Sequence, residues 1–223
     1  MIWFVLAITL YYLTKSIYIK YKNPLLNPLI LCPSILAFVI MMSWVPAKEF
    51  STGTKSISYL LGPATVSFAV PVYRHLDLIK KYAIELMLSV AAGSITAVMT
   101  SFLLSKWIHF SSQMESTMIP RSITTPIAMD VSKTLGGIPT LTAAFVICTG
   151  IIGSIVGPIV IRMCAIKTPI AKGVLLGMGA HGAGTSKAFE IGTVEGSISS
   201  IAMILGALAT IVWAYIWIPL LLS

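Results

Sequence analysis

Residues 177–196, GMGAHGAGTSKAFEIGTVEG, carry ionisable side chains between two apolar segments of the chain. Lys187 and Glu190 are three residues apart, so a helix would place them on one face, where they can pair. Each charge costs roughly 2.5–3.5 kcal/mol at the centre of a membrane-spanning helix, so both should face the protein interior or a water-filled cavity. The glycines interrupt the helix, and the free N–H groups of a resuming helix attract an anion. The pattern predicts an anion-binding site at Gly184, Thr185, Ser186 and Lys187.

Two further interpretations stay open for the ionisable residues of this segment. His181 and Glu190 are candidates for carrying protons, since a histidine changes its charge near neutral pH. His181 is also consistent with a hydrogen-bonded structural histidine. Lys187, Glu190 and Glu195 are also consistent with a place near the outer membrane surface, because Gly192 and a short loop precede the next apolar segment.

Enzyme-like motifs in this segment have no supporting context. GMGAHG matches G-x-G-x-x-G, but that pattern binds dinucleotides only between a strand and a helix of a soluble parallel unit. Ser186 and His181 lack the G-x-S-x-G turn of a hydrolase. Cys32, Cys148 and Cys164 are unclustered, so they predict neither a metal site nor a disulfide framework. We therefore expect no enzymatic activity, no cofactor and no metal centre.

The composition is that of an integral membrane protein. Hydrophobic residues make up 57% of the 223 residues, charged residues make up 10%, and the mean hydropathy is +0.94. The net charge of +8 comes from 15 basic and 7 acidic residues, but the basic residues lie mostly in short loops, as topology signals do. We expect membrane lipid around the protein and no nucleic-acid partner.

The hydropathy pattern predicts an all-α polytopic membrane protein with a single membrane domain, 1–223. Basic residues gather in the loops at 15–22, 74–81 and 162–172, which the positive-inside rule places in the cytoplasm, with the N-terminus outside. About seven spans of suitable length are predicted, at 2–19, 25–46, 57–73, 79–107, 138–161, 173–194 and 197–222.

The segment 119–136 does not fit this count of spans. It is short and contains prolines, Arg121 and Asp130, and a full crossing would move the basic loop at 162–172 to the outside. We predict that it enters and leaves the membrane on the outer side as a re-entrant or broken segment. Irregular backbone at this depth persists only where protein or water surrounds it, so the segment should line a cavity.

A weak internal repeat relates two halves of the chain, 25–107 and 138–222. It aligns ATVSFAVPV, residues 64–72, with AGTSKAFEI, residues 183–191. The identical pairs are Ala64 with Ala183, Ser67 with Ser186 and Ala69 with Ala188. The predicted topology gives the two halves opposite orientations, and inverted repeats with interrupted helices are typical of secondary transporters that bind substrate near the membrane midplane. Pro63 interrupts the first of these helices, as glycines interrupt the second.

Five ordered motifs span nearly the whole chain: YKNPLLNPLI (21–30), LGPATVSFAVPVY (61–73), PRSITTPIAMDVS (120–132), GAHGAGTSKAFEIG (179–192) and EGSISSIAMIL (195–205). Through these motifs the sequence resembles the LrgB/CidB family of bacterial membrane proteins. The resemblance implies a holin- or antiholin-like protein that modulates murein hydrolase activity and cytolysis. The family is also similar to the C-terminal half of the plastidal glycolate/glycerate translocator, and some members are linked to transport of small carboxylates such as pyruvate.

The resemblance further implies a place in the bacterial plasma membrane and a smaller membrane partner of the LrgA/CidA type. The residue before SITTPIA is basic in the family, as Arg121 is here. The family's later motif is close to SHALGTA, whereas this chain has AHGAGTS. His181, Gly184 and Thr185 match that motif and Ser186 does not, which weakens the transfer of one member's substrate to this chain.

The leading hypothesis is a secondary transporter of a small monocarboxylate similar to pyruvate, acetate or glycolate. Arg121 or Lys187 would offset the carboxylate charge, and His181 or Glu190 would couple protons. The remaining expected binding positions are Pro63, Ser67, Ser122, Thr124, Thr125, Pro126, Thr185 and Ser186. The alternative is a holin-type pore or a regulator of one, in which oligomerisation carries the function. For either role we favour a homodimer or a higher homo-oligomer.

Overall fold

The computed structural model describes residues 2–21, 26–42, 46–67 and 69–216, and its contacts divide the chain into two compact units. Unit 1 is Met1–Ser67 and unit 2 is Phe68–Ser223. Each unit is described by itself. The single membrane domain and the repeat between the halves 25–107 and 138–222 stay predictions.

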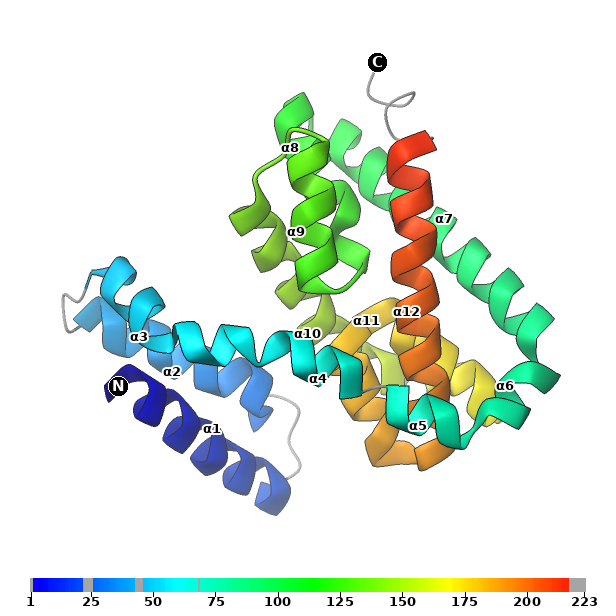
Figure 1. Ribbon diagram of the computed structural model, residues 1–223, viewed down its shortest axis with the longest axis horizontal. Coiled ribbons are helices and arrows are strands. Elements are labelled where there is room, and N and C mark those ends of the chain that lie inside the picture. Colours follow the sequence, from blue (N-terminus) through cyan, green and yellow to red (C-terminus); the bar gives the residue numbers. More distant parts are fainter. Residues whose placement is uncertain (1, 22–25, 43–45, 68, 217–223) are drawn as a thin grey trace. The chain divides into compact units, whose positions relative to one another are not determined.

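Every regular element among the described residues is a helix, which confirms the all-α class. Unit 1 contains α1 (Ile2–Tyr21), α2 (Pro28–Met42), α3 (Ala47–Tyr59) and α4 (Leu61–Ser67). Unit 2 contains α5 (Ala69–Arg74), α6 (Leu76–Lys81), α7 (Ala83–Trp107), α8 (Ser112–Met118), the 3-10 helix η2 (Ile119–Ser122), α9 (Thr125–Thr134), α10 (Pro139–Met163), α11 (Pro169–Ile191) and α12 (Thr193–Ile216) (Figure 1).

Four of the described helices are long and apolar enough to cross a membrane, namely α1, α7, α10 and α12. This number supports a multi-pass membrane protein and does not confirm seven spans. The region predicted as one span at 57–73 covers the end of α3, the short helix α4 and most of the short helix α5. Most of the region predicted as one span at 173–194 lies in α11, whose backbone is broken inside the helix, and its last residues reach the start of α12.

In unit 1, α1 packs against α2 and α3. The ring of Trp3 meets Phe50 edge to face with 5.7 Å between centroids. Gly53 makes this approach possible, because a Cβ there would lie 3.0 Å from the Trp3 ring. The thiol of Cys32 is buried and lies 3.9 Å from the carbonyl oxygen of Ala7. The N-terminal helix is therefore held against the next two helices by close side-chain packing.

In unit 2, α8, η2 and α9 form a hairpin that packs between α7 and α10. Its tip is the extended backbone of Ile123 and Thr124, which separates η2 from α9. Buried hydroxyl groups hold the base of the hairpin: the Ile138 N–H donates to Thr117 Oγ1 at 2.9 Å, and Thr142 Oγ1 lies 2.7 Å from Ser132 Oγ. Within 119–136 the helix is therefore interrupted between η2 and α9, and the chain reverses its direction there.

Thr142→Val is expected to lower the free energy of unfolding by about 1–3 kcal/mol, because buried polar groups then lose a partner. Thr142 is fully buried, and its hydroxyl also lies 2.9 Å from the Thr117 carbonyl oxygen. Thermal unfolding of the detergent-solubilised protein measures the change, with Thr142→Ser as the matched variant that keeps the hydroxyl. Equal losses in both variants would assign the effect to packing rather than to the hydrogen bonds.

The helix α11 is a second hairpin, with His181 at its tip. His181 has φ 47° and ψ −125°, so the limbs before and after it are separate helices. The two limbs pack closely against each other. Gly184 on the second limb lies so near the carbonyl oxygen of Leu176, eight residues earlier on the first, that an added Cβ would collide with it. The following helix touches both limbs: Ser199 of α12 contacts Gly177 on the first limb and Thr185 on the second. The segment 173–194 therefore does not cross the protein as one straight helix.

Close packing of small residues joins α10 to the first limb of α11. A Cβ on Gly153 would collide with the carbonyl oxygen of Gly179, and one on Gly157 would lie 2.6 Å from a methyl group of Leu176. On the other side of the second hairpin, α12 reaches α7, where the Trp213 indole N–H donates to Ser94 Oγ at 3.0 Å. In Figure 1 the hairpin of α8 and α9 lies toward one end of unit 2, and α11 lies toward the other.

Candidate functional site

Arg121 lies in η2, on the descending side of the first hairpin, just before its tip. Its Nη1 donates to Thr149 Oγ1 of α10 at 3.3 Å, while its Nε is buried and has no hydrogen-bond partner. Within the described ranges, the ion pairs join Lys106 to Glu115 and Lys187 to Glu190, and none includes Arg121. The guanidinium thus keeps an unmatched charge and an unmatched donor inside the protein.

His181, at the tip of the second hairpin, is 4% exposed, and both of its ring nitrogens are buried without a hydrogen-bond partner. The backbone of Ser122 and the guanidinium of Arg121 lie near the imidazole and influence its electrostatic environment. Most buried polar atoms in native proteins are paired, so three unpaired nitrogens on two neighbouring side chains indicate a place for a ligand or water.

The two hairpin tips meet beside the middle of α10. Thr149 receives the hydrogen bond of Arg121, and the next residue, Gly150, faces Ala180 and Ala183 on either side of the second tip. Thr149 is ten residues after the start of the helix, which is about 15 Å along its axis. This depth is close to the middle of a hydrocarbon core of about 30 Å.

The start of α9 adds backbone donors next to Arg121. Thr124 is the N-cap residue, but its side chain does not cap the helix, and a proline occupies the first turn. The first N–H groups of a helix lack intrahelical acceptors and attract negative charge. Together the guanidinium, the imidazole, the Thr149 hydroxyl and this helix start form a set of donors suited to a small anion.

Of the predicted site residues, the first hairpin brings five together: Arg121, Ser122, Thr124, Thr125 and Pro126. On the second hairpin, His181 lies beside Arg121, while other groups are occupied within the protein. The Thr185 hydroxyl bonds Ser199 Oγ at 2.9 Å and is fully buried, and the exposed Ser186 hydroxyl donates to the Gly182 carbonyl oxygen at 3.0 Å. Gly184 supports the close contact of the limbs.

Two predicted binding residues, Pro63 and Ser67, lie on α4 in unit 1. Their approach to Arg121 therefore stays a prediction.

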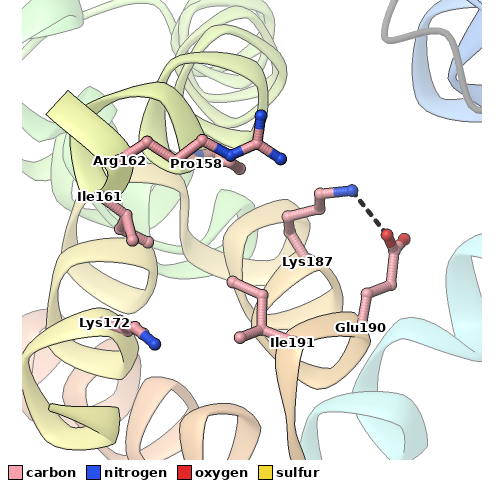
Figure 2. A pocket seen from close by; sticks show the side chains of 7 residues that line it. All are labelled: Pro158, Ile161, Arg162, Lys172, Lys187, Glu190 and Ile191. Atoms are coloured by element: carbon pink, nitrogen blue, oxygen red, sulfur yellow. Dashed lines mark hydrogen bonds and ion pairs between the residues drawn. The ribbon is translucent and has the colours of Figure 1, made fainter. Parts of the chain in front are cut away.

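Lys187 and Glu190 form the expected ion pair, with 2.6 Å between Nζ and Oε2. They line a separate cavity of about 300 Å³ at the base of the second hairpin, shown in Figure 2. The cavity lining is Pro158, Ile161, Arg162, Lys172, Lys187, Glu190 and Ile191, and it contains neither Arg121 nor His181. Lys187 is six residues beyond the tip, about 9 Å along the helix.

Sequence reasoning missed two polar residues near the first hairpin. Thr149 sits in an apolar run, where nothing in the residue pattern separates it from threonines that bond their own helix. Glu115 is 2% exposed and pairs with Lys106 at 3.0 Å, while its Oε2 has no hydrogen-bond partner. It lies in a stretch of mixed polarity that reads as a surface loop, so its burial is set by the tertiary fold.

Comparison with known proteins finds several relatives that align with most of the chain. The uncharacterised protein YwbG of Bacillus subtilis is 44% identical over 218 residues, which cover 98% of this chain and 95% of the relative. The holin-like protein CidB of Staphylococcus epidermidis is 39% identical over 202 residues, 91% of this chain and 88% of the relative. The antiholin-like protein LrgB of Bacillus cereus is 36% identical over 172 residues, 77% and 75% of the two chains.

No solved structure matches the chain. A profile described as the LrgB-like family matches residues 7–220, a range that includes both hairpins and the donors at their tips. Because this match leaves out only the two ends, and because the relatives align over three quarters or more of the chain, the protein belongs to the LrgB-like family.

Proposed function

We propose that this protein is a secondary transporter of a small monocarboxylate of the pyruvate, acetate or glycolate class, in the bacterial plasma membrane. The observation that carries the proposal is the half-buried Arg121, whose Nε has no partner and whose charge meets no carboxylate of the described chain. An uncompensated charge inside a protein is costly, so a bound anion would stabilise it. One carboxylate matches the fork of one guanidinium.

The arrangement of the hairpins supports alternating access. One hairpin approaches the site from each end of unit 2, so movement of either would open the site to one side only. Inverted elements whose interrupted helices meet near the midplane are the common design of secondary transporters. In this mechanism Arg121 and the start of α9 hold the carboxylate, Thr149 orients the guanidinium, and His181 exchanges the coupling proton. Glu190 remains the second candidate for that proton.

The orientation proposed from the basic loops is consistent with unit 2. Tyr82 at the start of α7 and Thr168 at the start of α11 line one cavity, so the loops at 74–81 and 162–172 lie at the same end. The positive-inside rule places that end in the cytoplasm. The second hairpin would then enter from the cytoplasm and the first from outside, and the N-terminus would lie outside.

The second candidate function is a holin-like pore or a regulator of one, favoured by the names of the relatives CidB and LrgB. Through the family, the protein would take part in the control of murein hydrolase activity and lysis, together with a smaller partner of the LrgA/CidA type. A homodimer or higher oligomer fits both roles. The unpaired donors at the hairpin tips favour the carrier, because a lesion needs no buried anion site. Under either candidate function, the protein is proposed to act without catalysing a chemical reaction.

Uptake into proteoliposomes tests the proposal. The protein is reconstituted with an encapsulated dye, a proton gradient is imposed, and uptake of labelled pyruvate, acetate, lactate and glycolate is measured. Saturable uptake that depends on the gradient and leaves the dye inside is the expected result. Dye release that rises with protein density, without saturable uptake, would show a pore instead.

A further inference from the structure

The cavity in Figure 2 lies at the junction of three helical segments. Pro158, Ile161 and Arg162 come from the last turns of α10, Lys172 from the first limb of α11, and Lys187, Glu190 and Ile191 from its second limb. Its volume of about 300 Å³ is at the lower end of the range for ligand sites, roughly 300–1,000 Å³. A molecule bound there would touch every segment that forms the base of the hairpin.

The cavity has a surplus of positive charge. It is lined by three basic residues and one acidic residue, which leaves a net charge of +2 (three minus one). Glu190 is engaged by Lys187 at 2.6 Å. Within the part of the chain that the structure describes, no ion pair is found for Arg162 or Lys172. The carboxylate of Glu190 balances only one of the three positive charges. The cavity is therefore suited to an anion that balances the other two.

The types of the lining residues favour a phosphate group. A guanidinium presents a planar fork of donors that fits phosphate oxygens, and lysine ammonium groups act as point charges beside it. Pro158, Ile161 and Ile191 add an apolar wall, which suits the glycerol and upper acyl carbons of a phospholipid. Basic pockets between membrane helices on the cytoplasmic side commonly bind lipid headgroups.

We propose that this cavity binds a phosphate group, that of an anionic phospholipid or of a free phosphate, between Arg162, Lys172 and Lys187. The bound phosphate bridges α10 and both limbs of α11 and holds the second hairpin against α10. The site is separate from the anion site at Arg121, and the inference does not rest on transport.

Lipid retention by the full-length protein tests the site. The protein is purified from membranes that contain phosphatidylglycerol and phosphatidylcholine, and bound lipid is counted by native mass spectrometry. The double variant Arg162→Gln, Lys172→Gln is compared with Lys80→Gln, Lys81→Gln, which removes the same charge from exposed positions of α6. One basic residue near a membrane surface raises the affinity for an anionic lipid about fivefold, so loss of two should weaken phosphatidylglycerol binding about 25-fold. The α6 variant should bind phosphatidylglycerol as the native protein does.

A second arm distinguishes the source of the phosphate. The delipidated protein is titrated with inorganic phosphate and with glycerol phosphate, and binding is measured by calorimetry. If the apolar wall selects a lipid, the affinity for both of these phosphates should be low. Saturable binding that the Arg162 and Lys172 variant loses would assign the site to free phosphate instead. The exchange Arg162→Lys, Lys172→Arg keeps both charges and should keep binding, which separates loss of the site from loss of the fold. Equal phosphatidylglycerol retention in both glutamine double variants, with no saturable phosphate binding, would overturn the proposal.

Discussion

Arg121→Gln is expected to lower the uptake of labelled pyruvate or acetate into proteoliposomes by at least about 30-fold, since removing one partner of a buried charge pair costs roughly 2–5 kcal/mol. Glutamine keeps much of the length and some hydrogen-bonding capacity of the side chain but has no charge for the carboxylate. The bond from Arg121 to Thr149 is lost as well, so the first hairpin also loses a tie to α10. Initial uptake rates at several substrate concentrations measure the effect.

The control for this prediction is Lys133→Gln on the same hairpin, which removes one exposed positive charge from α9 and should leave uptake near the native rate. Arg121→Lys restores the charge without the fork of donors, so partial activity is expected from it. Native uptake by Arg121→Gln, in protein that unfolds at the native temperature, would remove Arg121 from the substrate site.

Composition and helix breakers were enough to predict part of the fold. A chain with 57% hydrophobic and 10% charged residues has the composition of an integral membrane protein, and this follows without any structure. The break within 119–136 could also be predicted, because prolines and an arginine in a short apolar segment leave no continuous span. Arg121 was a candidate for the same reason, since a charge in such a place needs a partner.

The second hairpin could not be predicted from the same kind of pattern. The glycines of 169–191 predict an interruption but not a return of the chain, because 23 residues suit a segment that crosses and continues beyond the interruption. The fold-back depends on contacts that only the tertiary structure contains, chiefly Gly184 against Leu176 and Ser199 between both limbs. For this reason the sequence predicts one site for Lys187 and Arg121, whereas the structure places Lys187 in the cavity at the hairpin base.

Thr149 shows a related limit for the site. Many threonines of this chain donate to their own helix backbone, as Thr100 does to the carbonyl oxygen of Thr96 at 2.7 Å. A threonine whose hydroxyl instead bonds another segment lies among the same kinds of apolar residues in the sequence, so the sequence does not distinguish the two. Only the approach of η2 to α10 identifies Thr149 as the partner of Arg121. Contacts between separate segments, rather than residue types, therefore decide which hydroxyls belong to the site.

Gly184→Ala is expected to lower the free energy of unfolding by about 1–3 kcal/mol and to reduce uptake strongly, because overpacking forces the backbone to move. The added methyl group would collide with the Leu176 carbonyl oxygen and lie 2.8 Å from Ala180 Cβ. A main-chain atom cannot turn aside as a flexible side chain can, so the limbs must separate. That separation would displace His181 from Arg121 and Ser122.

Gly182→Ala is the matched variant, two residues away in the same limb, where a Cβ meets nothing within 4 Å. It makes the same chemical change and raises helix propensity equally but meets no clash, so it should unfold at or slightly above the native temperature and keep native uptake. Thermal unfolding and initial uptake rates, measured on both variants, separate the contact from the substitution. If both variants behaved alike, the close packing of the limbs would not be what holds His181 at the site, and the second hairpin would have to act by some other contact. A loss confined to Gly184→Ala ties the position of the imidazole to the place where Gly184 of the returning limb meets Leu176 and Ala180 of the first.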